Sequence, residues 1–278
     1  MENALAIWKK ISEDSSTNNR IFQRNKLKEY GQILVLDFIY AHPKYSQLVF
    51  YGGSCLAQCY GLPRLSEDID LVDLKKTVSL EKLAHDLHAY FDQKLGLKNT
   101  IDRQKFRVMI KLPILRELGL AKADESENLL LKIEVFSQFA YCLKFKIEIV
   151  PIFKYNRSIL VRTFDLPTLM ATKINAVLNR QWQKTNKEGK IILRVKGRDY
   201  FDLMWYLQKG IKPNLACIIG IKNGAELKEK LLVAVKRVDR QSLKLDLEAL
   251  IDQPELVQNL SRNLKEILVR QLDSSLAF

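Results

Sequence analysis

The segment between residues 47 and 74 constrains the fold most strongly. Two apolar stretches, 47–51 and 68–74, have the pattern of strands, and a Gly-Gly-Ser sequence (Gly52, Gly53 and Ser54) follows the first of them. The residues after the serine favour a short helix. A chain that passes from strand through glycines into a helix and back to a strand must form a sheet with helices against it.

Two aspartates lie on the second of these strands. Asp68 and Asp70 stand at positions i and i+2, so their side chains share one face, while Ile69 and Leu71 point into the core. Neighbouring carboxylates repel each other unless a divalent cation lies between them. The spacing therefore predicts a metal site.

The two glycines allow backbone amides to approach phosphate oxygens, and a helix N-terminus favours negative charge. Taken alone, Gly-Gly-Ser is more often a turn and Asp-x-Asp more often an exposed strand edge. In the order strand, glycines, helix and acid pair, the two motifs together favour a functional site over a simple turn and strand edge. A metal-binding acid pair beside a phosphate-binding turn is typical of phosphoryl or nucleotidyl transfer.

The rest of the chain divides near residue 165, and we expect domains at 1–165 and 166–278. Helical periodicity and strand alternation predict an α+β first part, with helices at 4–11, 20–41 and 79–95 and strands at 106–112, 129–136, 144–152 and 158–164. The second part is predicted to be helical, with helices at 166–182, 197–209, 225–238 and 255–272.

Composition excludes several classes of protein. Hydrophobic residues make up 47% of the 278 residues, and glycine and proline number only 11 and 7, which argues against a disordered chain. The chain shows neither a signal peptide nor a membrane span, so we expect a cytoplasmic protein. Without zinc spacing, the four cysteines are predicted to be reduced thiols: Cys55, Cys59, Cys142 and Cys217.

The positive charge is concentrated in one stretch. The formal net charge is +13, and residues 166–212 hold ten basic and three acidic residues, a net +7. Such a tract predicts a path for a phosphate backbone. The candidate RNA-binding residues in it are Arg180, Lys184, Lys187, Lys190, Arg194 and Lys196.

Two predicted helices carry charged residues on apolar faces. Lys173 lies within the apolar stripe of its helix, so it either extends to solvent or reaches a buried anion such as a triphosphate. Asp199 and Asp202 share one side of a helix that is apolar almost all round. Buried carboxylates need basic partners, so we expect Asp199 to contact Lys173 or Arg180.

These motifs resemble a known superfamily. Gly52-Gly53-Ser54 followed by Arg64-x-Ser66-x-Asp68-x-Asp70 is similar to the signature of DNA polymerase β-like nucleotidyltransferases. The variant resembles the AbiEii/AbiGii-type toxins of type IV toxin-antitoxin systems. Three later matches resemble further motifs of that branch: Lys132-Ile-Glu134, Lys173, and Arg198-Asp199 with Asp202. The matched positions span residues 50–207.

The resemblance implies a polymerase β-like core, with a mixed sheet and flanking helices, and a mainly helical C-terminal lobe. It implies transfer of NMP from an NTP to an acceptor hydroxyl, dependent on Mg²⁺ or Mn²⁺. The implied acceptor is RNA, above all the 3′ end of tRNA. The implied biology is a toxin of a phage-defence system, countered by a cognate antitoxin.

The resemblance also assigns roles. Asp68 and Asp70 would hold the metal, and Asp199 would complete the catalytic centre, with Asp202 and Arg198 as additional candidates. The residues implied in NTP binding are Gly52, Gly53, Ser54, Arg64, Ser66 and Lys173. The third carboxylate is open between Glu134, Glu148 and a motif-four aspartate, and the second motif favours Glu134.

Two alternatives remain. A small-molecule acceptor, as in antibiotic nucleotidyltransferases, fits poorly, because a cationic aminoglycoside would be repelled by the basic tract. The second alternative is a catalytically inactive RNA-binding protein on the same scaffold. The intact Asp68/Asp70 pair argues against it.

The basic tract generates a prediction. Neutralising Lys184, Lys187 and Lys190 together should weaken RNA binding and leave NTP binding intact, because these residues would contact only the phosphate backbone. Titration of RNA and of NTP into the triple variant checks this. Undiminished RNA affinity would contradict it.

Overall fold

A computed structural model describes residues 3–14, 17, 19–180, 184–185, 188–189, 191–193 and 195–274. The chain folds as two compact units. Unit 1 comprises Met1–Phe139 and Glu148–Thr163, and unit 2 comprises Ala140–Ile147 and Phe164–Phe278. The predicted boundary near residue 165 lies close to the start of the main part of unit 2 at Phe164. The short segment Ala140–Ile147, which precedes that boundary, also belongs to unit 2.

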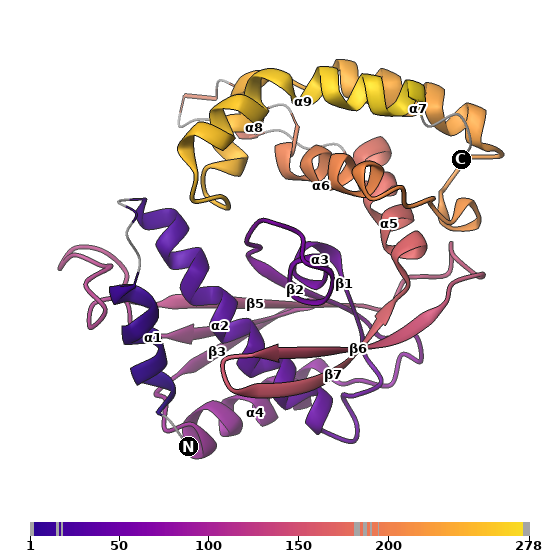
Figure 1. The fold of residues 1–278 in the computed structure, drawn as a ribbon. Coiled ribbons are helices and arrows are strands. Elements are labelled where there is room, and N and C mark those ends of the chain that lie inside the picture. Colours follow the sequence, from indigo (N-terminus) through magenta and orange to yellow (C-terminus); the bar gives the residue numbers. More distant parts are fainter. Residues whose placement is uncertain are drawn as a thin grey trace. The chain divides into compact units, whose positions relative to one another are not determined.

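A seven-stranded mixed sheet organises the first half of the chain, with the order β3-β4-β5-β2-β1-β7-β6 (Figure 1). The strands are β1 (Val49–Tyr51), β2 (Asp68–Val72), β3 (Thr100–Gln104), β4 (Arg107–Leu112), β5 (Leu129–Phe136), β6 (Ile147–Lys154) and β7 (Arg157–Phe164). β2 runs parallel to β5, and β1 runs parallel to β7. The pairs β1–β2, β3–β4 and β4–β5 are antiparallel.

Helices cover one face of this sheet. They are α1 (Ala4–Glu13), α2 (Arg20–Ala41) and α4 (Leu80–Ala89), the last continued by a π-helix, η1 (Tyr90–Lys94). α2 contacts β5, and α4 contacts β3 and β4 (Figure 1). Gly31 of α2 lies so close to β5 that an added Cβ would stand 2.7 Å from Leu131 Cδ1. The side chains of β5 that alternate with Leu131 therefore project from the opposite face.

Unit 2 is mainly helical. Its elements are α5 (Leu166–Asn179), α6 (Gly197–Gln208), η2 (Leu215–Cys217), α7 (Gly224–Lys236), α8 (Arg240–Leu247) and α9 (Pro254–Ser274). α6 contacts α5, α8 and α9, and most of its side chains are buried. Its apolar residues therefore form the centre of this unit's core, as a helix that is apolar almost all round requires.

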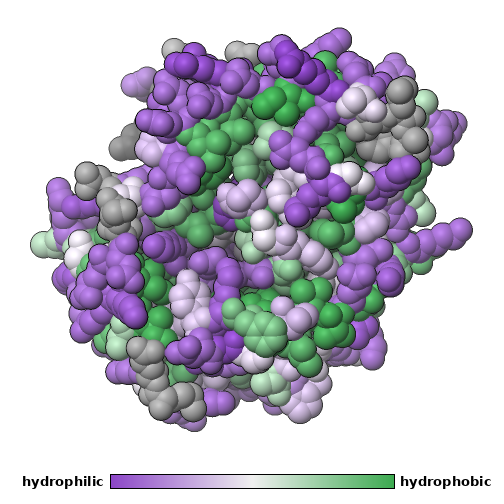
Figure 2. All heavy atoms as spheres, viewed as in Figure 1, coloured by the Kyte–Doolittle hydropathy of each residue, from purple (hydrophilic) through white to green (hydrophobic). Residues whose placement is uncertain are grey.

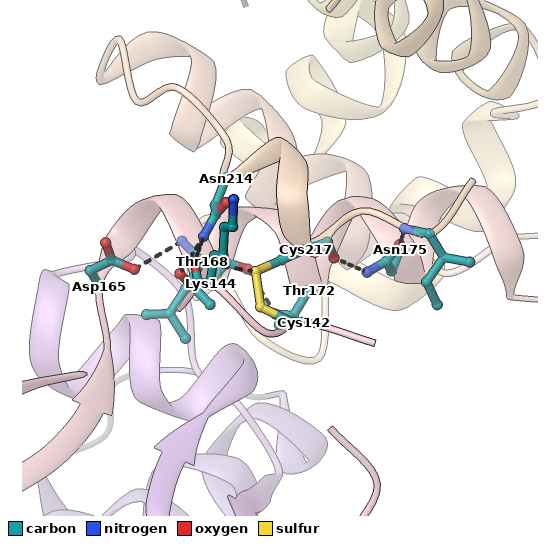
Figure 3. The surroundings of a disulfide bond; sticks show 10 residues. Cys142, Lys144, Asp165, Thr168, Thr172, Asn175, Asn214 and Cys217 are labelled. Atoms are coloured by element: carbon teal, nitrogen blue, oxygen red, sulfur yellow. Dashed lines mark hydrogen bonds between the residues drawn. A yellow bond between two sulfur atoms is a disulfide. The ribbon is translucent and has the colours of Figure 1, made fainter. Parts of the chain in front are cut away.

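Two cysteines form a disulfide, which corrects the prediction of four free thiols. Cys142 is bonded to Cys217, 75 residues later, and this joins the segment Ala140–Ile147 to η2 (Figure 3). Next to it, Asn214 Nδ2 donates to the Lys144 carbonyl oxygen at 2.6 Å. Cys55 and Cys59 are free, and burial raises the pKa of the Cys55 thiol.

The basic tract between α5 and α6 contains a short antiparallel ribbon, β8 (Lys184–Thr185) and β9 (Ile191–Leu193), which was not predicted. On the face drawn in Figure 2, polar side chains predominate, with apolar patches between them. No helix in the described ranges combines the length and apolar character needed to span a bilayer.

Candidate active site

Two aspartates of β2 project from the face of the sheet opposite α2. Ile69 and Leu71 between and after them are 1% and 0% exposed, whereas Asp68 and Asp70 are half-buried. The alternation predicted for this strand is confirmed. Both carboxylates consequently lie on one side of β2.

Glu134 lies beside this pair because β5 runs parallel to β2. In the register of the two strands Asp70 is the partner of Glu134, and Asp68 is the partner of Lys132. Neighbouring strands are about 4.8 Å apart, so three carboxylates gather within two strands. Glu148, the alternative third carboxylate, lies on β6 at the sheet edge, with β7 and β1 between it and β2. The geometry favours Glu134.

The glycines predicted to approach phosphate lie directly against motif residues. Gly52 has φ +78°, and a Cβ there would collide with Asp70 Oδ2. A Cβ on Gly53 would stand 2.8 Å from Arg64 Nη2 and 2.9 Å from Ser66 Oγ. Glycine is favoured at Gly52 by its positive φ and by the close approach of Asp70, and at Gly53 a Cβ would require Arg64 and Ser66 to shift. Both glycines are the first residues of α3 (Gly52–Tyr60), so Arg64 and Ser66 lie at the start of this helix.

The side chain of Ser54 points inward. It is fully buried, and its hydroxyl donates to the backbone carbonyl of Asp68, which fixes the start of α3 to the start of β2. Its side chain is therefore committed to that bond in this structure. Among the described residues, no side chain caps α3 at Tyr51, and such a helix N-terminus favours an anionic ligand.

Two basic side chains lie among the carboxylates. Lys132 Nζ is 2.7 Å from Asp68 Oδ2 and 3.5 Å from Glu134 Oε1. On the antiparallel neighbour β4, Arg107 donates to Glu134 Oε1 from Nε at 2.9 Å and from Nη2 at 2.5 Å. The sequence predicted a divalent cation between Asp68 and Asp70, whereas in this structure the ammonium group of Lys132 lies between Asp68 and Glu134.

No three Asp, Glu, His or Cys side chains within the described ranges converge closely enough to hold a metal ion. In this structure the carboxylates of Asp68 and Glu134 are instead paired with Lys132, and Glu134 is also paired with Arg107.

A second cluster of charges lies within unit 2. Lys173 Nζ is 2.9 Å from Asp199 Oδ1 and 2.7 Å from Asp202 Oδ2, and Arg180 Nη1 is 2.6 Å from Asp199 Oδ2. The side chains of Asp199 and Asp202 are 6% and 0% exposed. The expected contact of Asp199 with Lys173 or Arg180 is confirmed, and both are made.

The carboxylate of Asp199 stays ionised although it is buried. Burial opposes its ionisation, but the neighbouring Lys173 and Arg180 outweigh this and lower its pKa from 3.8 to about 2. The carboxylates of Asp199 and Asp202 thus connect α6 to α5 through buried ion pairs.

Comparison with known proteins places the chain in a family. A family model described as nucleotidyl transferase AbiEii toxin, type IV TA system, matches residues 34–273. The chain belongs to the AbiEii family. This confirms the resemblance found in the motifs and makes the protein a nucleotidyltransferase of a toxin family.

Two solved structures from Helicobacter pylori are similar to the chain at less than 20% sequence identity. JHP933 from Helicobacter pylori is 19% identical, with 93% of this chain and 96% of that chain covered and a TM-score of 0.48. A protein of H. pylori described provisionally as a nucleotidyltransferase is 18% identical, with 89% and 95% covered and a TM-score of 0.48. Among curated proteins no relative matches at a significant level.

In this AbiEii chain, the predicted RNA-binding residues are described only in part. Lys187, Lys190 and Arg194 lie outside the described residues, as does the side chain of Lys184. The other two, Arg180 and Lys196, are described.

Arg180 forms the ion pair with Asp199. For Lys196, burial lowers the pKa, and Arg198 and Arg180 lower it further. Arg198 itself donates its backbone amide to Asp246 Oδ2 at 2.9 Å.

Sequence reasoning missed several residues at the unit 1 site. Arg107 was not assigned, because its pairing with Glu134 depends on the register between β4 and β5. Phe136 was also missed, although its position two residues after Glu134 on a strand was a signal that it shares the carboxylate face.

The depressed pKa of Asp199 generates a prediction. A folded-state pKa near 2 against an ordinary 3.8 stabilises the fold above about pH 4, and this stabilisation is lost as pH falls toward 2. Its size is about 2 to 3 kcal/mol. Asp199→Asn should lower the free energy of unfolding at pH 7 and flatten its pH dependence between pH 4 and 2.

Urea unfolding at a series of pH values measures this. Asp252→Asn, an exposed aspartate of the same unit, serves as the matched control and should follow the wild-type curve. Parallel curves for wild type and Asp199→Asn would contradict the assignment.

Proposed function

We propose that this AbiEii nucleotidyltransferase transfers NMP from an NTP to a hydroxyl of RNA, with the 3′ end of tRNA as the acceptor. The observation that supports it is the placement of Asp68, Asp70 and Glu134 on adjacent strands, beside a glycine turn at the start of a helix. The +7 charge of residues 166–212 supports a polyanionic acceptor over a cationic small molecule.

The residues fit a divalent cation such as Mg²⁺ or Mn²⁺. Carboxylate oxygens are the ligands such ions prefer, and the position between Asp68 and Glu134 already accommodates the positive charge of Lys132. Asp68 and Asp70 would hold the ion. When bound, it would supply Lewis-acid polarisation of the phosphoryl oxygens.

The reaction then requires little of the chain beyond positioning. The acceptor oxygen forms a bond to the α-phosphorus, and the bond from that phosphorus to the α–β bridging oxygen breaks. Pyrophosphate leaves with that electron pair, and the hydroxyl proton passes to a carboxylate, for which Glu134 is the proposed acceptor. The amides at Gly53 and Ser54 would receive the phosphates.

The roles of Lys173 in phosphate binding and of Asp199 in catalysis remain predictions from the family resemblance. The action of the protein in phage defence, opposed by a cognate antitoxin, is part of the same proposal. Membership of a type IV toxin family supports it.

The central test is removal of one carboxylate. Asp70→Asn should reduce incorporation of labelled NMP into RNA by at least about two orders of magnitude, because it removes one of two proposed metal ligands. Incubation of total RNA with each labelled NTP in turn measures it. Glu67→Gln, which alters a carboxylate paired at 3.8 Å with Lys28, is the matched control and should retain activity. Full activity of Asp70→Asn would refute the proposal.

Lys132 offers a test that does not depend on turnover. Because its ammonium lies between two carboxylates, a divalent cation must displace it or share the site with it. Lys132→Met should therefore bind Mn²⁺ about tenfold more tightly than wild type in the absence of NTP. Electron paramagnetic resonance of free Mn²⁺ gives the affinity.

The matched control is Lys111→Met, which removes a lysine on β4 that pairs with Asp102 at 2.5 Å. It should leave Mn²⁺ affinity at the wild-type value. An affinity of Lys132→Met no higher than wild type would show that the metal does not bind at these carboxylates.

A further inference from the structure

Three aromatic side chains adjoin the carboxylates of unit 1, and we call Tyr51, Phe106 and Phe136 the aromatic shelf. The ring centres of Phe106 and Phe136 are 5.1 Å apart with planes inclined by 30°, and those of Phe136 and Tyr51 are 6.3 Å apart at 80°. The rings thus form one contiguous cluster. None of them has a role in the transfer reaction described above.

The shelf shares a face with the acids. Phe136 follows Glu134 by two residues on β5, so the two side chains project from the same side, roughly 7 Å apart along the strand. Tyr51 of β1 is the register partner of Asp70. The aromatic and acidic side chains therefore border one surface of the sheet.

The side chain of Arg107 connects the shelf to the acids. The guanidinium of Arg107 lies 5.3 Å from the ring centre of Phe106, and its Nη2 is 2.5 Å from Glu134 Oε1. Phe106 is nevertheless 39% exposed. A large ring held at a fixed position by neighbours, yet open to solvent, is suited to stacking on a flat ligand.

The order of the parts along β2 matches the order of the parts of a nucleotide. β1 and β2 are antiparallel, with Val49 opposite Val72 and Tyr51 opposite Asp70, so the glycines that follow Tyr51 lie toward Asp68. Phe136 lies opposite Val72, at the other end. The sequence in space is glycine turn, carboxylates, then Phe136.

An NTP has the same linear order: terminal phosphates, α-phosphate, ribose, base. With the terminal phosphates at the glycines and the α-phosphate at the carboxylates, the base extends toward Phe136 and Phe106 of the shelf, while Tyr51 lies beside Asp70. We propose that the aromatic shelf stacks the base of the NTP. This rests on the proposed function and adds the subsite that receives the nucleoside.

The test separates the base from the phosphates. Binding of each NTP and of inorganic tripolyphosphate to the full chain is measured by calorimetry in the presence of Mg²⁺ and without RNA. Phe106→Leu keeps an apolar side chain and removes the aromatic face. It should weaken binding of the NTP that wild type prefers by roughly tenfold and leave tripolyphosphate binding unchanged.

Two further variants guard against indirect effects. Phe106→Trp restores an aromatic face and should retain wild-type NTP affinity. Phe153→Leu, which changes a 74% exposed phenylalanine on β6, is the matched control and should bind NTP as wild type does.

Unchanged NTP affinity in Phe106→Leu would overturn the proposal. In a separate titration with RNA, a loss confined to RNA binding would also overturn it and would assign the shelf to the acceptor's base. Equal weakening of NTP and tripolyphosphate would also overturn it, as a distortion of the phosphate site. Failure of the proposed function is distinct, because it would appear as absence of NMP incorporation into RNA by wild type, whatever the NTP affinity of the Phe106 variants.

Discussion

The parallel pairing of β2 with β5 is the constraint on which the site depends. Because residues i and i+2 of a strand share a face, the register that sets Asp70 beside Glu134 also sets Asp68 beside Lys132. A slip of one residue would turn all these side chains to the opposite face, where α2 packs. The same pairing concentrates negative charge, which Lys132 and Arg107 balance. The carboxylates proposed to bind a divalent cation are thereby held together, in this structure, by the chain's own cations.

Close approach of the backbone is the second requirement. Gly52 and Gly53 leave room that any Cβ would fill, against Asp70 on one side and against Arg64 and Ser66 on the other. Ser54 anchors the helix that follows through its bond to the Asp68 carbonyl. The glycine turn, the acid pair and the aromatic shelf thus have fixed relative positions within unit 1. This is the preorganisation that transfer of a charged group requires.

Unit 2 also places carboxylates close together, and there they are buried and paired with basic side chains. Two carboxylates on a buried helix would be costly if unpaired, and Lys173 with Arg180 neutralises them. This was foreseeable, because a basic residue on an apolar helical stripe and acids on an apolar helix are each costly to bury alone. The disulfide between Cys142 and Cys217 was not foreseeable, since the spacing of cysteines carries no information on which of them meet in space.

The sequence by itself determined much of the local structure and the protein family. Helical periodicity predicted α2 with the bounds that the structure has, and the motif residues led to the AbiEii family. Weakly apolar elements escaped prediction: β3 is largely exposed and lacks alternation, and α8 is short. Only the tertiary structure decided what depends on register and long-range contact. Arg107 meets Glu134, and Phe106 stacks near Phe136, because β4 and β5 pair in one alignment. A linear sequence records which groups are present, but the distances between strands far apart in the chain are fixed only when the sheet forms.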